Sequence, residues 1–102
     1  KSTYILSLNT AIPENNILYQ NYPNPFNPTT EIKFSITKSG IGNLSIYDVN
    51  GKLIDELVNT YLKAGTYSVK FNLNNKQISS GILFYKLTSE NFSETKKMVI
   101  VK

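Results

Sequence analysis

Residues 43–58 read Asn-Leu-Ser-Ile-Tyr-Asp-Val-Asn-Gly-Lys-Leu-Ile-Asp-Glu-Leu-Val, and this stretch decides the fold class. Its two halves, 43–49 and 53–58, are rich in the β-branched and aromatic residues that favour strands. The dipeptide Asn50-Gly51 between them readily takes the positive φ angles of a type I′ turn, which joins antiparallel strands. We therefore predict a β-hairpin in which Asn50 and Gly51 form the structural turn.

The segments on either side of this hairpin alternate apolar and polar residues with a period of two. Residues 30–37 and 66–73 do so most clearly, as strands with one buried face do. Residues 82–88 are apolar on both faces and predict a central strand, and residues 94–101 predict the closing strand. Strands that recur at about ten to twelve residues, without a sustained helical period, predict an all-β fold, an Ig-like antiparallel β-sandwich of about seven strands.

The first part of the chain differs from the rest in its pattern. Residues 3–8 have the composition of a short strand, and the polar stretch after them has that of a linker. We therefore divide the chain into residues 1–16, a linker or the tail of a preceding domain, and residues 17–102, the sandwich domain. Because the sequence starts at Lys1 rather than at Met, we expect a piece of a longer protein or a processed product.

A proline-rich block, residues 21–30, precedes the first long predicted strand. Its three prolines fix φ and hold the residues before them extended, so the block is rigid and non-helical. We expect an ordered lead-in whose Tyr22 and Phe26 cap one end of the sandwich. The alternative is a proline-rich ligand for an aromatic groove of a partner.

The composition excludes several classes of chemistry, because the 102 residues include no Cys, His, Trp or Arg. Without Cys or His, the chain cannot form a zinc-finger site, a thiol redox pair, a Cys or His nucleophile or a Ser-His-Asp triad. Without Arg, it lacks the bidentate clamp for phosphate or carboxylate. The sequence also has no apolar run of about 18 residues, which a transmembrane segment would need. It has no basic segment followed by an apolar one, which a signal peptide would need.

The net charge is +4, and it is unevenly spread. Residues 52–102 carry eight Lys against four acidic side chains, whereas residues 1–51 are balanced. Lys96, Lys97 and Lys102 make the end of the chain basic. A basic tail can attract an anionic surface, but strand lysines commonly serve to keep sheet edges soluble. The absence of Arg argues against nucleic acid as a partner.

No group of residues forms a candidate active site, and we expect neither a catalytic residue nor a cofactor. Asp55 and Glu56 are adjacent on a predicted strand, so their side chains point to opposite faces. The stretch 48–51, Asp-Val-Asn-Gly, resembles the start of a calcium loop but lacks the later oxygen ligands. We therefore expect a plain turn there and no metal site.

Six blocks of sequence lie in order between Leu18 and Lys102. They are Gln20-Asn-Tyr-Pro-Asn-Pro-Phe-Asn-Pro28, Thr30-Glu-Ile-Lys-Phe34, Leu44-Ser-Ile-Tyr-Asp-Val-Asn-Gly-Lys52, Ala64-Gly-Thr-Tyr67, Ser80-Gly-Ile-Leu-Phe-Tyr85 and Lys97-Met-Val-Ile-Val-Lys102. In this order and spacing, the blocks resemble the C-terminal sorting domain of the type IX secretion system. Flagellar hook-capping proteins carry a similar Ig-like module, so the two ends of the pattern are more diagnostic than its middle.

The resemblance implies a function without catalysis. Such domains follow an N-terminal cargo domain, and the outer-membrane secretion machinery recognises them once the exported protein is in the periplasm. A sortase-like cysteine protease then cuts upstream, here within residues 9–17, and the cargo reaches the cell surface or the medium. The recognition elements that the resemblance implies are Gly65 and Tyr67, and the closing strand with Lys97, Met98, Val99, Ile100, Val101 and Lys102. We add Lys96 to this set because of its charge.

The closing strand also suits recognition on physical grounds. A terminal strand can pair with another sheet edge through its backbone, and its lysines would steer it toward an acidic receptor. Met98 and Ile100 fall at core positions, so we expect both to be buried. Gly65 and Tyr67 can also serve the fold itself, as a turn residue and a core aromatic.

Two other functions stay open at this point. A self-associating extracellular subunit would donate the strand at residues 3–8 to the open edge of a neighbouring copy and so build a filament. A carbohydrate-binding sandwich would need a planar row of exposed aromatic side chains, whereas most of the tyrosines lie at core or turn positions.

Overall fold

The computed structural model of the chain describes residues 5–9, 11–73, 78 and 81–101. This part of the chain contains eight β-strands and no helix. In chain order they are β1 (Ile5–Asn9), β2 (Ile17–Leu18), β3 (Thr29–Ile36), β4 (Gly40–Tyr47), β5 (Leu53–Leu62), β6 (Gly65–Asn72), β7 (Gly81–Ser89) and β8 (Phe92–Ile100).

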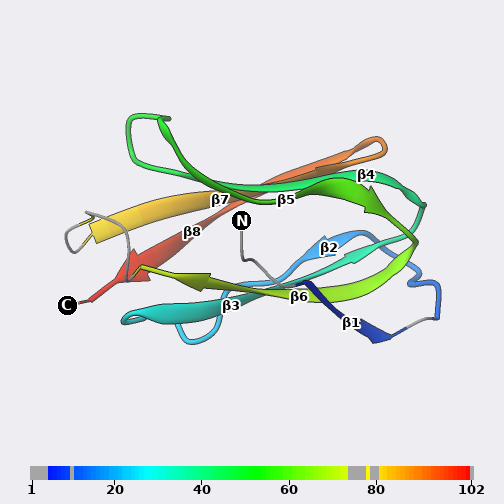
Figure 1. The fold of residues 1–102 in the computed structure, drawn as a ribbon, viewed down its shortest axis with the longest axis horizontal. Coiled ribbons are helices and arrows are strands. Elements are labelled where there is room, and N and C mark those ends of the chain that lie inside the picture. Colours follow the sequence, from blue (N-terminus) through cyan, green and yellow to red (C-terminus); the bar gives the residue numbers. More distant parts are fainter. Residues whose placement is uncertain (1–4, 10, 74–77, 79–80, 102) are drawn as a thin grey trace.

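The strands form two four-stranded sheets that pack face to face (Figure 1). The first sheet has the order β1-β6-β3-β2 and the second the order β5-β4-β7-β8, and every pairing between these strands is antiparallel. The predicted antiparallel β-sandwich is confirmed, and the predicted central strand is β7, between β4 and β8. The alternation of apolar and polar residues did not predict β2, because its two residues are too few to show a period.

Alternation along the strands fills the space between the sheets with apolar side chains. The core includes Leu18, Ile32, Phe34, Ile36, Tyr67, Val69 and Phe71 on the side of the first sheet, and Leu44, Ile46, Leu83, Tyr85, Leu87, Met98 and Ile100 on the side of the second. Met98 and Ile100 are 0% and 2% exposed, which confirms the expectation that both are buried.

The predicted hairpin is present as β4 and β5, but the prediction of a type I′ turn is wrong. Of its two central residues, only Gly51 has a positive φ, of 83°. The Gly51 N–H donates to the Asp48 carbonyl at 3.0 Å, and the Asp48 carboxylate accepts the N–H groups of Asn50 and Lys52, each at 2.9 Å. Asp48 therefore organises a three-residue loop, because an Asp side chain can bond the backbone ahead of it, and Gly51 supplies the left-handed residue.

The four edge strands differ in regularity. β5 has two register shifts against β4, β1 has one against β6, and β2 pairs through two residues only. Bulges and short edge strands hinder pairing with another chain. β8, by contrast, pairs with β7 over nine residues without a shift, so it is the regular edge of the sandwich.

The N-terminal strand lies within the first sheet. β1 pairs with β6, and the half-buried Ile5 packs against the core. This strand overlaps the predicted segment 3–8 at residues 5–8, while residues 3 and 4 lie outside the described residues. The division of the chain after residue 16 stays a prediction.

Candidate functional site

The closing strand β8 is an edge of the second sheet and forms a hairpin with β7 (Figure 1). Its side chains alternate, so Met98 and Ile100 point into the core while Lys97, Val99 and Val101 point away from it. Lys97 and Val101 are exposed, and Val99 is half-buried. Lys102, also predicted as a recognition residue, lies outside the described residues.

The two adjacent lysines of β8 do not act from the same side. Lys96 pairs across the sheet with the fully buried Tyr85, so it stands on the inward face of the strand, where it is half-buried. Its Nζ forms an ion pair with Glu94 Oε2 at 3.6 Å. An inward-pointing charge on an edge strand is a known protection against edge-to-edge pairing. Lys97 is therefore the lysine of this pair that β8 presents to a partner.

A second segment covers the outer edge of β8. We call residues 20–26 the strap. The Phe26 N–H donates to the Val99 carbonyl, and the Val101 N–H donates to the Phe26 carbonyl, both at 3.0 Å. Two strap side chains add to this: Gln20 Nε2 donates to the Lys97 carbonyl at 2.8 Å, and Asn24 Oδ1 accepts from the Val99 N–H at 2.9 Å.

The strap changes what β8 can offer to a partner. In an antiparallel pair, alternate residues direct their backbone groups toward the neighbouring strand and away from it. The outward groups over residues 97–101 are those that the strap binds, so this half of the edge is occupied. A partner strand could pair with the backbone of residues 97–101 only after the strap had left.

A buried hydrogen-bond network fixes the start of the strap. Asn21 is 2% exposed, and its Nδ2 donates to Thr30 Oγ1 at 2.9 Å and to the Pro23 carbonyl at 3.2 Å. The Asn21 N–H donates to the Tyr85 hydroxyl at 2.8 Å, and this hydroxyl donates to the Tyr19 carbonyl at 2.7 Å. The phenol of a core residue of β7 therefore satisfies two backbone groups at the entry of the strap.

This position changes the acidity of the phenol. Burial raises the pKa of Tyr85 from 10.0 to about 12; the bond from the Asn21 N–H opposes this shift, and the negative charge of Glu94 adds to it. The protonated phenol, the form that donates to the Tyr19 carbonyl, is thus favoured in the folded state. Its contribution to stability is complete below pH 10.0 and is lost as the pH rises through about 12.

We expect wild type to lose about 2–3 kcal/mol more stability than Tyr85→Phe between these two pH values. Urea unfolding of both proteins across this range measures the difference. The two proteins share every other titratable group, so the comparison isolates the phenol of Tyr85. Parallel losses of stability would contradict the role given to Tyr85.

The two aromatic residues expected to cap the sandwich behave differently. Phe26 is 2% exposed and lies edge-on to Phe71, with 6.2 Å between ring centroids, so the expectation holds for it. Tyr22 is 80% exposed, so the expectation is wrong there. The backbone of Tyr22 forms a bridge with Glu31, which directs its side chain outward over the first sheet.

The surroundings of the two predicted recognition residues of β6, Gly65 and Tyr67, indicate a structural role. Tyr67 is buried and stacks on Phe34 with 5.5 Å between centroids, and its hydroxyl donates to the Lys63 carbonyl at 2.6 Å. Gly65 is buried at the start of β6, opposite Ile36. β6 belongs to the first sheet and β8 to the second, so the fold does not join these two elements on one exposed face.

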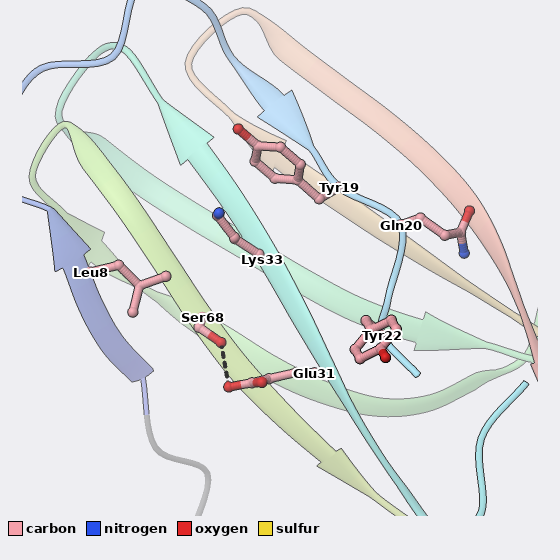
Figure 2. A pocket seen from close by; sticks show the side chains of 7 residues that line it. All are labelled: Leu8, Tyr19, Gln20, Tyr22, Glu31, Lys33 and Ser68. Carbon is pink, nitrogen blue, oxygen red and sulfur yellow. Dashed lines mark hydrogen bonds between the residues drawn. The ribbon is translucent and has the colours of Figure 1, made fainter. Parts of the chain in front are cut away.

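An open hollow lies on the outer face of the first sheet (Figure 2). Its lining is Leu8, Tyr19, Gln20, Tyr22, Glu31, Lys33 and Ser68. Ser68 Oγ donates to Glu31 Oε2 at 2.9 Å, and Lys33 Nζ lies 4.9 Å from the centre of the Tyr19 ring. These contacts engage Ser68, Glu31 and Lys33 and one of the two aromatic rings of the hollow.

The tyrosines among the described residues do not form the flat row that a carbohydrate-binding face needs. Tyr22 and Tyr61 are 80% and 60% exposed, but Tyr22 lies beside β3 in the first sheet and Tyr61 is in β5 of the second. Tyr67 and Tyr85 are buried. The two most exposed rings therefore do not share a face of the sandwich.

The described residues include no group of three or more Asp or Glu side chains placed to hold a metal ion. The carboxylate of Asp48 instead accepts two backbone N–H groups in the turn. Nor does the described part of the chain contain a helix that is long and apolar enough to cross a membrane.

The sequence pattern did not reveal the partners of the strap. Gln20, Asn21, Asn24 and Tyr85 had no assigned role, although three of them stand in the block from Gln20 to Pro28. The high proportion of Asn and Pro in this block is the feature that could have indicated these contacts, because amide side chains can bond backbone groups that prolines leave unpaired.

A family model described as secretion system C-terminal sorting domain matches residues 20–101. The matched segment begins with the strap and ends just after β8. No curated protein and no solved structure shows a significant match to the chain.

Proposed function

Because the chain belongs to the family of secretion system C-terminal sorting domains, we propose that the secretion machinery recognises it through the outward side chains of β8: Lys97, Val99 and Val101. The domain is a non-catalytic sorting signal of the type IX secretion system, and it targets an attached cargo for secretion. A signal of this kind acts by being bound, so its function depends on an accessible surface.

The observation that supports the proposal is the division of β8 into two sides. Met98 and Ile100 are buried, and the strap binds the outer backbone edge over residues 97–101. What remains accessible at this end of the strand is the row of outward side chains, with the exposed Lys97 among them. Met98 and Ile100 then support recognition by holding the strand in the sheet.

The segment before the strap has the properties of a cleavage site. Ala11, Ile12, Glu14 and Asn15 are exposed and lie outside any strand, and Ile12 is 71% exposed. Asn16, which follows, is half-buried, and its Oδ1 accepts the Thr37 N–H at 2.9 Å. Exposed backbone outside the strands is a preferred substrate of proteases. A sortase-like protease would therefore cut within residues 9–17.

The cargo is destined for secretion or the cell surface. In the proposed route, the domain folds in the periplasm, the outer-membrane machinery binds β8, and the protease separates domain and cargo outside. The net charge of +4 and the exposed Lys97 suit a receptor surface with carboxylates, because opposite charges speed encounter and fix orientation.

We expect Lys97→Glu to lower the exported fraction of a fused passenger severalfold without changing stability, because Lys97 is exposed and its side chain points away from the core. The assay places a fluorescent protein before the full chain, in a bacterium that has the type IX machinery, and compares fluorescence outside and inside the cells. Lys86→Glu, at an exposed position of β7 opposite Ser45 and Thr95, is the matched charge reversal and should export normally. Equal export of all three proteins would argue against a recognition role for Lys97.

The edges of the sandwich disfavour the alternative of a filament built by strand addition. β1 and β5 carry register shifts, β2 is two residues long, and β8 combines the strap with an inward lysine. Each of these features hinders edge-to-edge pairing. These edges therefore disfavour a filament built by strand addition.

A further inference from the structure

An apolar patch lies on the outer, solvent-facing side of the second sheet. We call it the outer patch, and its members are Tyr47, Leu53, Ile82, Phe84, Val99 and Val101. Leu53, Ile82 and Val101 are 51%, 40% and 50% exposed, and the other three are half-buried. None of these side chains belongs to the core between the sheets.

The strand register makes the patch continuous. Leu53 of β5 is opposite Tyr47 of β4, Tyr47 is opposite Phe84 of β7, and Phe84 is opposite Lys97 of β8. Residues directly opposite one another on the same face of a sheet are in contact range. A row of three apolar side chains therefore crosses the sheet and ends at Lys97.

A second, shorter row runs beside the first. Ile82 of β7 is opposite Val99 of β8. Ile82 is two residues from Phe84, and Val99 is two residues from Lys97, so both lie on the same face as the first row. Val101 follows Val99 on the same side of the chain. The patch is thus continuous with the outward side chains of β8 that the proposed function assigns to recognition.

The composition of the outer face changes toward the other end of the sheet. The next residues of β4, β7 and β8 on this face are Ser45, Lys86 and Thr95, which are opposite one another, and Asn43, Thr88 and Ser93 follow. The far end of the sheet carries one exposed apolar pair, Ile41 opposite Tyr61, whereas the outer patch joins six apolar side chains, three of them exposed by 40% or more. The outer patch is therefore the larger continuous apolar surface of the two.

The fold directs a partner to this face rather than to an edge. The strap binds the outer backbone of β8 over residues 97–101, so strand addition is blocked there. β5, the other edge of the second sheet, carries two register shifts. A partner that approaches the closing strand therefore meets side chains on the outer face.

We propose that the outer patch is the surface on which the domain docks to a component of the secretion machinery, and that this component offers an apolar face with carboxylates at one margin. The inference rests on the proposed function and extends it from β8 to the three strands beside it. Continuity with Lys97 and Val99 argues for the same partner, and the position of Lys97 at the end of the apolar row argues for an acidic margin. Aromatic and aliphatic anchors beside a peripheral charge are common in protein interfaces.

The test introduces a charge into the centre of the patch in the passenger assay. Ile82→Glu and Ile82→Lys both place a charge on β7, and Ile41→Glu is the matched control. Ile41 is 60% exposed on the outer face of β4, at the opposite end of the same sheet. Each variant exchanges one exposed isoleucine of a strand, so the cost to stability should be small and similar, and thermal unfolding of the purified chains measures it.

We expect both Ile82 variants to lower the exported fraction about tenfold, as the loss of an interface anchor does, and Ile41→Glu to export as wild type does. If Ile82→Lys exports normally, or if Ile41→Glu fails to the same extent as the Ile82 variants, the outer patch is not the docking surface. If wild type itself is not exported, the proposed sorting function fails instead, so the two failures are distinguishable.

Discussion

Phe26→Ala is expected to lower the free energy of unfolding by about 3–5 kcal/mol, the usual cost of removing a buried aromatic ring. Phe26 is 2% exposed and contacts Phe71 edge-on, so its removal leaves a cavity between strap and core. Its backbone also pairs with Val99 and Val101. Loss of the ring therefore weakens the attachment of the strap to β8 as well as the packing of the core.

Two measurements check this expectation. Urea unfolding gives the change in stability, and amide hydrogen exchange reports whether the Val101 N–H, which donates to the Phe26 carbonyl, loses its protection. Tyr22→Ala is the matched control, because Tyr22 is an aromatic residue of the same strap and is 80% exposed. It should change stability by less than about 0.5 kcal/mol. Equal effects of the two substitutions would contradict the account of the strap.

Met98→Ala is expected to cost about 2–5 kcal/mol, since Met98 is fully buried in the closing strand. The chain then unfolds more readily before the machinery meets it, and the exported fraction falls. That loss of export reflects folding, so it should be regained in part when the cells grow at lower temperature. Thermal unfolding of the purified variant and export at two temperatures provide the measurements.

Lys97→Glu separates recognition from folding in the same strand. Its side chain is exposed, so stability should stay within about 0.5 kcal/mol of wild type. Its export defect should then persist at the lower temperature. If Met98→Ala keeps its stability, the core position of Met98 is wrong. If the Lys97→Glu defect disappears in the cold, its role in recognition is wrong.

Much of the fold follows from the sequence because alternation is a local property. The strands β3, β6, β7 and β8 appear as runs with a period of two or as doubly apolar runs, and the structure places them within a few residues of the predicted bounds. The burial of Met98 and Ile100 follows from the same alternation. Each of these predictions depends on residues close together in the chain.

The predictions that failed depend on contacts or on exact backbone angles. The turn at Asn50-Gly51 uses the carboxylate of Asp48 rather than two positive φ angles. The dipeptide Asn-Gly is compatible with either turn conformation. Tyr22 and Phe26 share one proline-rich block, yet only Phe26 is buried. Which of them faces the core is decided by the bridge between Tyr22 and Glu31, nine residues away.

The candidate site was predicted only in part for the same reason. The sequence indicated the closing strand but not the strap, since Gln20 and Asn24 meet Lys97 and Val99 across 77 and 75 residues of chain. The outer patch also required the register, because Tyr47, Leu53 and Phe84 come from three different strands. Contacts of this range are set by the packing of the sheets.

The strap gives the order of the two end blocks a physical meaning within this chain. The block that begins at Gln20 and residues 97–101 of the closing block lie against each other in the folded domain. A chain that has not folded cannot bring them together. The domain can therefore present its outward β8 face in the defined position only once it has folded.

Export of a passenger by the wild-type chain is the decisive test of the sorting function. A fluorescent protein with a periplasmic signal is fused before the full chain and expressed in a bacterium with the type IX machinery and in the same strain lacking it. We predict that fluorescence appears on the surface or in the medium of the first strain and stays in the periplasm of the second. Retention of a folded fusion in the periplasm of both strains would contradict the sorting function.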